Sequence, residues 1–242
     1  MDGAPGITPA YVAVMIASLL VGALVSRRTQ QPLAISKRQR LAIALGALIG
    51  GAFFAKLPYL FGDLDALISG RVWLESGRTL TLGLIGGYVG VEVSKRMAGV
   101  RIKTGDGLAV PVAVSIGIGR IGCFVAGCCY GTPTLLPWGV RFHDDVARHP
   151  TQLYEAAFHL SAAALLHWLG LRGLFQRQRI KLYFMAYFVY RFVTEWIREE
   201  PRVALGLTLY QLIALGGVAL FAALYAYDAK RAPTSTASTA EA

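Results

Sequence analysis

Three cationic side chains stand within stretches of the sequence that are otherwise apolar: Lys56, Arg120 and Arg191. A charge at the centre of a bilayer costs about 2.5–3.5 kcal/mol on insertion scales, so each should face a cavity, a partner or the interface. Guanidinium groups commonly hold phosphate, because their planar fork donates paired hydrogen bonds and keeps its charge. The pattern predicts an internal anion site, suited to a phospholipid headgroup. The alternative is charge pairing between helices or within one, for example Arg191 with Glu195 at i, i+4.

Four polar side chains near position 190 follow one another at helical spacing. The separations are four, four and three residues, which predicts one shared helical face. The residues concerned are Tyr187, Arg191, Glu195 and Arg198. Two further acids, Glu92 and Glu155, stand in other apolar stretches and also require a partner or a cavity.

All three cysteines of the chain fall within residues 119–131, at a C-x4-C-C spacing, together with four glycines. This spacing is not a recognised zinc pattern, because four ligands would require a distant histidine. Two interpretations stay open. The cysteines are small buried apolar residues, or one is a reactive thiol whose pKa Arg120, one turn before Cys123, helps to lower. We expect no metal and no cofactor.

The composition indicates which elements position these residues. The chain has 242 residues, of which 55% are hydrophobic and 16% charged, and its formal net charge is +10. Soluble domains are about 25% charged, so this chain has too few polar residues to cover a water-facing surface. An ordinary soluble enzyme, a disordered protein and a disulfide-stapled secreted module are therefore excluded.

Seven apolar stretches have lengths near the roughly 20 residues that a helix needs to cross a bilayer. They cover residues 9–26, 41–62, 79–94, 107–130, 152–170, 180–198 and 205–227. The third is short and rich in glycine. We predict an all-α membrane protein, a polytopic bundle of seven transmembrane helices.

The basic residues between these stretches indicate orientation. Alternate loops carry fifteen Lys and Arg on one side and six on the other. The positive-inside rule places the richer side in the cytoplasm, hence the N-terminus outside and the C-terminus inside. We expect one transmembrane domain over residues 1–231 and a disordered cytoplasmic tail over 232–242. No basic stretch is interleaved with stacking aromatics, so no nucleic-acid partner is expected.

Several motifs, in order between residues 45 and 215, resemble those of the prolipoprotein diacylglyceryl transferase family. Residues 119–131 resemble the signature G-R-x-G-N-F-x-N-x-E-x-x-G without gaps, and Tyr187 and Arg191 fall on the Tyr-x-x-x-Arg pair. The remaining matches are Ala55-Lys56-Leu57-Pro58-Tyr59 to A-R-L-G-Y, Pro137-Trp138 to P-W, His149–Glu155 to H-P-x-Q-L-Y-E, and Arg198-x-x-Pro201 to R-x-P.

The resemblance implies a seven-helix enzyme of the bacterial cytoplasmic (inner) membrane. Such an enzyme transfers diacylglyceryl from phosphatidylglycerol to the lipobox cysteine thiol in the signal peptide of a prolipoprotein, and releases glycerol phosphate. It implies a catalytic set and a set that binds the phospholipid. The catalytic set is Arg120, Arg191 and Tyr187; the binding set is Lys56, Tyr59, Gly119, Gly122, Cys123, Gly131 and Arg198.

The sequence departs from the family pattern at several positions. Cys123, Ala126 and Cys128 replace the signature's Asn, Asn and Glu, and Ile85 replaces the His of an H-G-G-L-I-G element. That His is the usual acceptor of the thiol proton. The base must then be another group, or the thiol arrives ionised; the candidates are Glu92, Glu195, His143 and His149. Two other functions stay open. The first is a transferase that uses the same phospholipid donor with a different acceptor, in which the cysteines act as a transient lipid carrier. The second is a non-catalytic lipid-binding protein.

Overall fold

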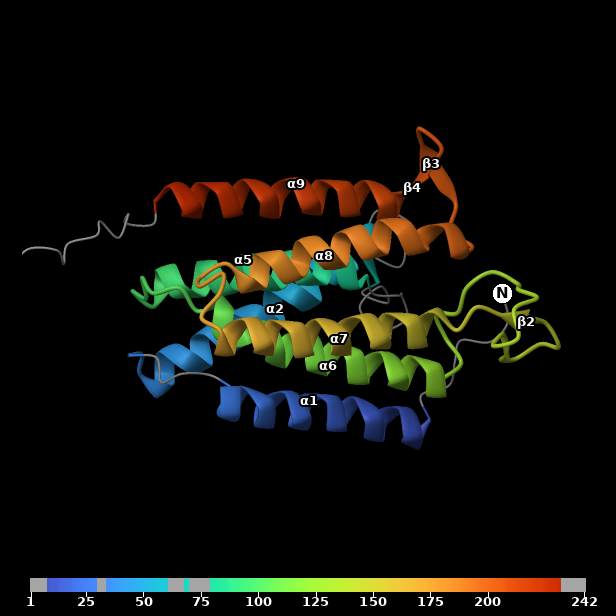
Figure 1. The fold of residues 1–242 in the computed structure, drawn as a ribbon, viewed down its shortest axis with the longest axis horizontal. Helices are drawn as coiled ribbons and strands as arrows, with labels where there is room; N and C mark the ends of the chain where they lie inside the picture. Colours follow the sequence, from blue (N-terminus) through green and yellow to red (C-terminus); the bar gives the residue numbers. More distant parts are fainter. Residues whose placement is uncertain (1–7, 30–33, 61–67, 70–78, 232–242) are drawn as a thin grey trace, which may run out of the picture.

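The computed structural model describes residues 8–29, 34–60, 68–69 and 79–231. Within these residues the chain forms seven α-helices that run along the long axis of the molecule in alternating directions (Figure 1). They are α1 (Pro9–Thr29), α2 (Lys37–Leu60), α5 (Leu80–Met97), α6 (Gly105–Val125), α7 (Thr151–Leu171), α8 (Arg179–Thr194) and α9 (Leu209–Lys230). This described part of the chain is therefore helical apart from two small hairpins, and its helices follow the predicted apolar stretches.

Four of these helices, α1, α2, α6 and α9, are long and apolar enough to cross a membrane. The other three lie against them, and α8 has only 16 residues. The short, glycine-rich stretch 79–94 does form a helix, α5, of 18 residues. The predicted tail, residues 232–242, lies outside the described residues.

Two predicted helix ends are wrong. α6 stops at Val125 instead of continuing to residue 130, because Gly127 and Cys129 adopt positive φ angles of 64° and 63° that a right-handed helix does not allow. α8 stops at Thr194, and a 3-10 turn, η1 (Glu195–Ile197), follows. Arg198 is extended, so it does not continue the helical face of Tyr187. The Ile197 carbonyl accepts a hydrogen bond of 2.9 Å from the backbone N–H of Thr132, and Pro201 has no N–H to compete for it.

Helix packing uses glycine where backbones meet. A Cβ on Gly50 would collide with the carbonyl oxygen of Gly86, and one on Gly90 with that of Gly46, so α2 and α5 touch backbone to backbone. α8 and α9 are joined by aromatic packing instead: Phe221 of α9 lies 5.0 Å from Phe184, ring centroid to centroid. This aromatic layer forms the core of the bundle.

The two ends of the bundle differ. One end carries both hairpins, β1 (Val140–Arg141) with β2 (Ala147–Arg148) and β3 (Arg202–Ala204) with β4 (Leu207–Thr208), each antiparallel (Figure 1). We call this the hairpin end, residues 126–150 and 195–208. We call the opposite end, residues 98–104 and 172–178 with the adjoining helix ends, the basic end.

Ion pairs join the chain segments of the basic end. Arg179 pairs with Asp106 at 3.1 Å, and Lys103 and Lys181 both pair with Asp228. A cavity of about 400 Å³ opens there, with Arg28 in its lining. None of the predicted site residues lines this cavity.

Candidate active site

A buried carboxylate, Glu155, is the centre of the polar contacts near the hairpin end. It lies one turn after the start of α7 and is 1% exposed. Its Oε1 accepts a hydrogen bond of 2.7 Å from the Tyr187 hydroxyl and forms an ion pair of 2.9 Å with Nη2 of Arg120. Its Oε2 accepts a hydrogen bond of 3.2 Å from Nη2 of Arg198. One carboxylate thus holds three predicted site residues.

This arrangement explains how Glu155 can be buried. The desolvation of an ion costs several kcal/mol, which only well-placed partners offset. Two guanidinium groups and a hydroxyl supply them here, from α6, α8 and the segment after η1. The position near the N-terminus of α7 also favours a negative charge. Glu155 therefore fixes Arg120 and Arg198 relative to each other.

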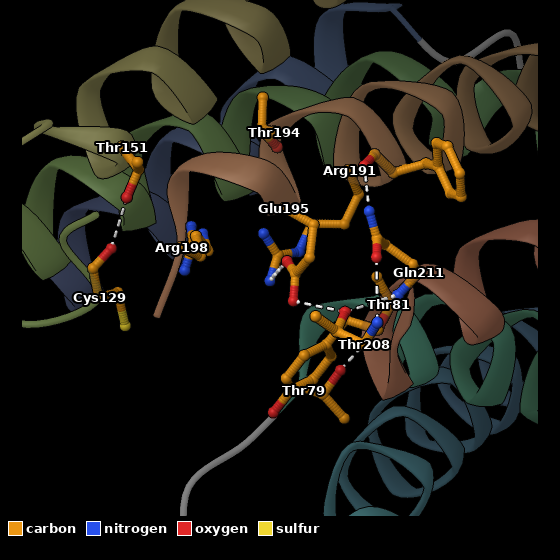
Figure 2. A network of polar contacts seen from close by, with 12 residues as sticks. Thr79, Thr81, Cys129, Thr151, Arg191, Thr194, Glu195, Arg198, Thr208 and Gln211 are labelled. Carbon is orange, nitrogen blue, oxygen red and sulfur yellow. Dashed lines mark hydrogen bonds and ion pairs between the residues drawn. The ribbon is translucent and has the colours of Figure 1, made fainter. Parts of the chain in front are cut away.

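A second buried ion pair lies next along α8. Nη2 of Arg191 is 2.7 Å from Oε2 of Glu195, which confirms the predicted i, i+4 pair. The Thr208 hydroxyl donates to Oε1 of Glu195 at 2.9 Å and accepts from the backbone N–H of Gln211 at 3.2 Å (Figure 2). Thr208 and Gln211 form a capping box at the start of α9. The end of α8 is therefore tied to the beginning of α9.

Arg191 keeps donor capacity that this pair does not use. Its Nη1 is buried, and within the described part of the chain it has no hydrogen-bond partner. The guanidinium carbon lies 5.4 Å from the ring centroid of Tyr210, whose hydroxyl is 3.1 Å from that of Tyr59. A buried donor without a partner is costly to maintain, and an anionic ligand would satisfy it.

The two clusters adjoin along α8. Tyr187 and Arg191 stand one turn apart on this helix, and Arg191 interacts electrostatically with Glu155. Figure 2 shows Arg198 between Cys129 on one side and Glu195 on the other. The three guanidinium groups pair with two buried carboxylates, Glu155 and Glu195, and the Glu200 carboxylate also lies near Arg191 and Arg198. Lys56 is buried on α2, one turn before Tyr59.

The first turn of α7 holds the segment that follows α6. The Thr151 hydroxyl donates to the Cys129 carbonyl at 2.7 Å, and the Gln152 amide donates to the Cys128 carbonyl. Nη1 of Arg120 lies 4.0 Å from Sγ of Cys123. The cysteines are therefore part of the wall of the site, next to its cations.

The predicted glycines fall in two places. Gly119 and Gly122 face α1, where Met15 and Val14 are nearest, and the structure does not bring them to Glu155. Gly131 is enclosed by protein: a Cβ there would collide with the carbonyl oxygen of Ile197. Its position is fixed by a hydrogen bond of 2.9 Å from its N–H to the His149 carbonyl.

Comparison with known proteins identifies the family of this chain. The family model described as prolipoprotein diacylglyceryl transferase matches residues 8–227. The chain belongs to the prolipoprotein diacylglyceryl transferase family. Relatives named phosphatidylglycerol–prolipoprotein diacylglyceryl transferase are known from several bacteria. That of Methylococcus capsulatus is 35% identical over 76% of this chain and 75% of its own. Those of Clostridium tetani and Methylocella silvestris are each 30% identical, over 79% and 91% of this chain and 81% and 89% of theirs.

The predicted proton acceptors of this family member are occupied or distant. Glu92 pairs with Lys95 at 2.8 Å, and Glu195 pairs with Arg191. A ring nitrogen of His143 lies 2.9 Å from the Gly127 carbonyl oxygen, and one of His149 lies 3.3 Å from the Tyr154 hydroxyl. The role of base stays a prediction for each of them.

Sequence reasoning missed the central position of Glu155 in this family member. The available signal was a carboxylate inside an apolar stretch, with His159 at i+4. In the structure Nε2 of His159 lies 3.8 Å from Oε1 of Glu155, and its Nδ1 lies 2.8 Å from the Tyr183 hydroxyl. Thr208 was also missed, because nothing near it in sequence predicts a contact with Glu195.

The loop charges at the hairpin end also have partners. Arg148 joins β2 to the segment after η1 through ion pairs of 3.0 Å with Asp144 and 2.9 Å with Glu199. The hydrogen bond from Arg148 lowers the pKa of Asp144. Burial raises the pKa of Glu200, and the nearby Glu195 carboxylate adds to this effect. The hairpin β1–β2 is thus held over the site of the transferase.

Proposed function

We propose that this protein transfers the diacylglyceryl group of phosphatidylglycerol to the lipobox cysteine thiol of prolipoproteins and releases glycerol phosphate. Family membership over residues 8–227 supports the reaction. The observation that carries the assignment to this site is a buried donor of Arg191, its Nη1, which has no hydrogen-bond partner in the described part of the chain. This donor lies one turn along α8 from Tyr187, which holds Glu155 together with Arg120 and Arg198.

The reaction requires what this site supplies. The acceptor thiolate attacks the glyceryl carbon next to the phosphate, so an S–C bond forms and a C–O bond breaks. The thiol proton is lost, and the electron pair of the broken bond stays on the departing phosphate. Preorganised cations stabilise this developing charge and lower the barrier. Arg120 and Arg191 are the proposed clamp, with Lys56 as a third donor.

The other proposed residues surround this clamp. Tyr187 and Tyr59 donate hydrogen bonds towards phosphate or glycerol oxygens, and Tyr187 also orients Glu155. Arg198 guides the substrate at the outer edge. Gly119, Gly122, Cys123 and Gly131 complete the proposed phospholipid site, the first two by letting α6 approach α1.

In the proposed topology all seven helices span the bacterial inner membrane as one domain over residues 1–231. The N-terminus and the hairpin end lie outside, and the basic end and C-terminus face the cytoplasm. The concentration of Lys and Arg at the basic end supports this orientation. It places the site on the side where a translocated signal peptide would present its cysteine.

The test is an assay with purified protein, phosphatidylglycerol and a lipobox peptide, in which mass spectrometry detects the diacylglyceryl thioether. We expect Arg191→Ala and Arg120→Ala each to lower the rate about 10²–10³-fold, the range for losing one donor to a developing charge. Arg202→Ala is the control, because Arg202 is an exposed arginine at the same end whose side chain donates a hydrogen bond to the Gly206 carbonyl of its own hairpin.

Three other outcomes would each overturn the proposal. Glycerol phosphate release without a modified peptide would indicate a different acceptor. Lipid binding without any turnover would indicate a non-catalytic binding protein. Equal losses in the Arg202→Ala control would mean that the arginine effects are not specific to the site.

A further inference from the structure

The sulfur atoms of all three cysteines gather at one place beside the site. Cys123 stands in the last turn of α6, and Cys128 and Cys129 follow in the loop. Their Sγ atoms all lie within 4.8 Å of one another, and those of Cys128 and Cys129 are 3.7 Å apart. Their thiols are free, and Cys129 is an exposed residue.

These separations fit a single metal ion. A zinc–thiolate bond is about 2.3 Å long, so two sulfurs of a tetrahedral site lie about 3.8 Å apart. The pair Cys128–Cys129 already has this separation. The remaining sulfurs need to move by no more than about 1 Å, which rotation of a cysteine side chain provides.

The backbone and its hydrogen bonds hold the sulfurs in this arrangement. Cys129 adopts the left-handed conformation with φ 63°, which is unfavourable for a residue with a side chain. Hydrogen bonds from Gln152 and Thr151 to the carbonyls of Cys128 and Cys129 maintain it. Strain of this kind persists only where surrounding contacts impose it, and it gathers at functional positions.

The charges nearby favour thiolates. Arg120 lies 4.0 Å from Sγ of Cys123, and Arg198 lies on the side of the cluster that faces Glu195 (Figure 2). Three thiolates with a divalent ion carry one net negative charge, which a guanidinium group balances.

We propose that Cys123, Cys128 and Cys129 form a binding site for one thiophilic metal ion, of the class of Zn²⁺, Cd²⁺ and Cu⁺. The three thiolates are the protein ligands, and a fourth position is left for water or a substrate atom. Each thiol that binds the ion releases its proton, so the affinity rises with pH. The site is additional to the transferase reaction and does not depend on it.

The test is a Cd²⁺ titration of the purified, reduced full chain in detergent, followed by the ultraviolet charge-transfer absorption of Cd–thiolate bonds. We expect the absorption to rise to one equivalent and then stop. Cys123→Ala and Cys129→Gly should each weaken binding at least about tenfold, since each removes one of three ligands. Cys129→Gly is chosen because glycine adopts the positive φ of this position without strain.

Two further Cd²⁺ titrations, of Arg191→Ala and of the denatured wild-type chain, serve as controls. Arg191→Ala should keep the absorption while it loses transferase activity, so failure of one proposal leaves the other testable. The wild-type chain in denaturant should bind more weakly than the folded chain, because the sulfurs are no longer held together. The proposal is overturned if saturation needs other than one equivalent, if the single variants bind as the wild type does, or if unfolding leaves the affinity unchanged.

Discussion

The hairpin end and the basic end are both held by ion pairs, but the consequence of losing a partner differs between them. Both pair Arg or Lys with carboxylates contributed by distant segments of the chain. Next to the hairpin end Glu155 is 1% exposed, whereas at the basic end the Lys103 side chain is 43% exposed. Water can replace a lost partner of Lys103 and cannot do so for Glu155. The ion pairs of Glu155 therefore fix the geometry of the site, whereas the pair of Lys103 with Asp228 joins an exposed side chain to the end of α9.

The largest expected effect comes from Glu155→Gln. The change removes the charge that holds Arg120 and Arg198, and leaves two half-buried guanidinium groups without their shared, fully buried partner. Breaking a buried pair costs about 3–5 kcal/mol, so we expect a clearly lower Tm together with loss of diacylglyceryl transfer. Thermal unfolding in detergent and the peptide assay measure both.

Glu199→Gln is the matched control for this change, because Glu199 pairs with Arg148 at the same end but is more than half exposed. It should leave activity and Tm close to those of the wild type. If the two variants behaved alike, burial would not explain why the ion pairs of Glu155 matter more than the pair of Glu199 with Arg148.

An intermediate effect is expected from Thr208→Val. The hydroxyl both donates to Glu195 and caps α9, so its loss should lower the free energy of unfolding by about 0.5–2 kcal/mol, the range for a lost cap. Activity should fall as well, because Glu195 then holds Arg191 less firmly. Denaturant unfolding and the peptide assay measure this. Thr208→Ser keeps the hydroxyl and should restore both; a Ser variant as impaired as Val would count against this explanation.

The smallest effect is expected from Lys103→Ala at the basic end. Asp228 keeps its second partner, Lys181, and exposed pairs contribute about 0.2–1 kcal/mol. Tm at low salt should fall slightly and the difference should shrink at high salt, while transfer stays at the wild-type rate. A loss of activity in this variant would show that the two ends are coupled.

The sequence predicts the helices well because each apolar stretch is long enough to need burial or lipid. It also predicts the Arg191–Glu195 pair, since both partners belong to neighbouring turns. It could not predict the contacts of Glu155, whose partners come from two other helices and from an extended segment. Arg198 reaches Glu155 only because the chain leaves the helical path before Pro201, which a regular helical spacing does not reveal.

The contact of α2 with α5 has a mechanical consequence. Because Gly50 and Gly90 bring the two backbones together with no side chain between them, α2 and α5 leave no space for a lipid chain to pass between them at these positions. Lys56 belongs to this pair of helices, whereas Arg120 and Arg191 belong to α6 and α8. A lipid entering sideways from the bilayer would therefore have to pass beside this pair and not through it.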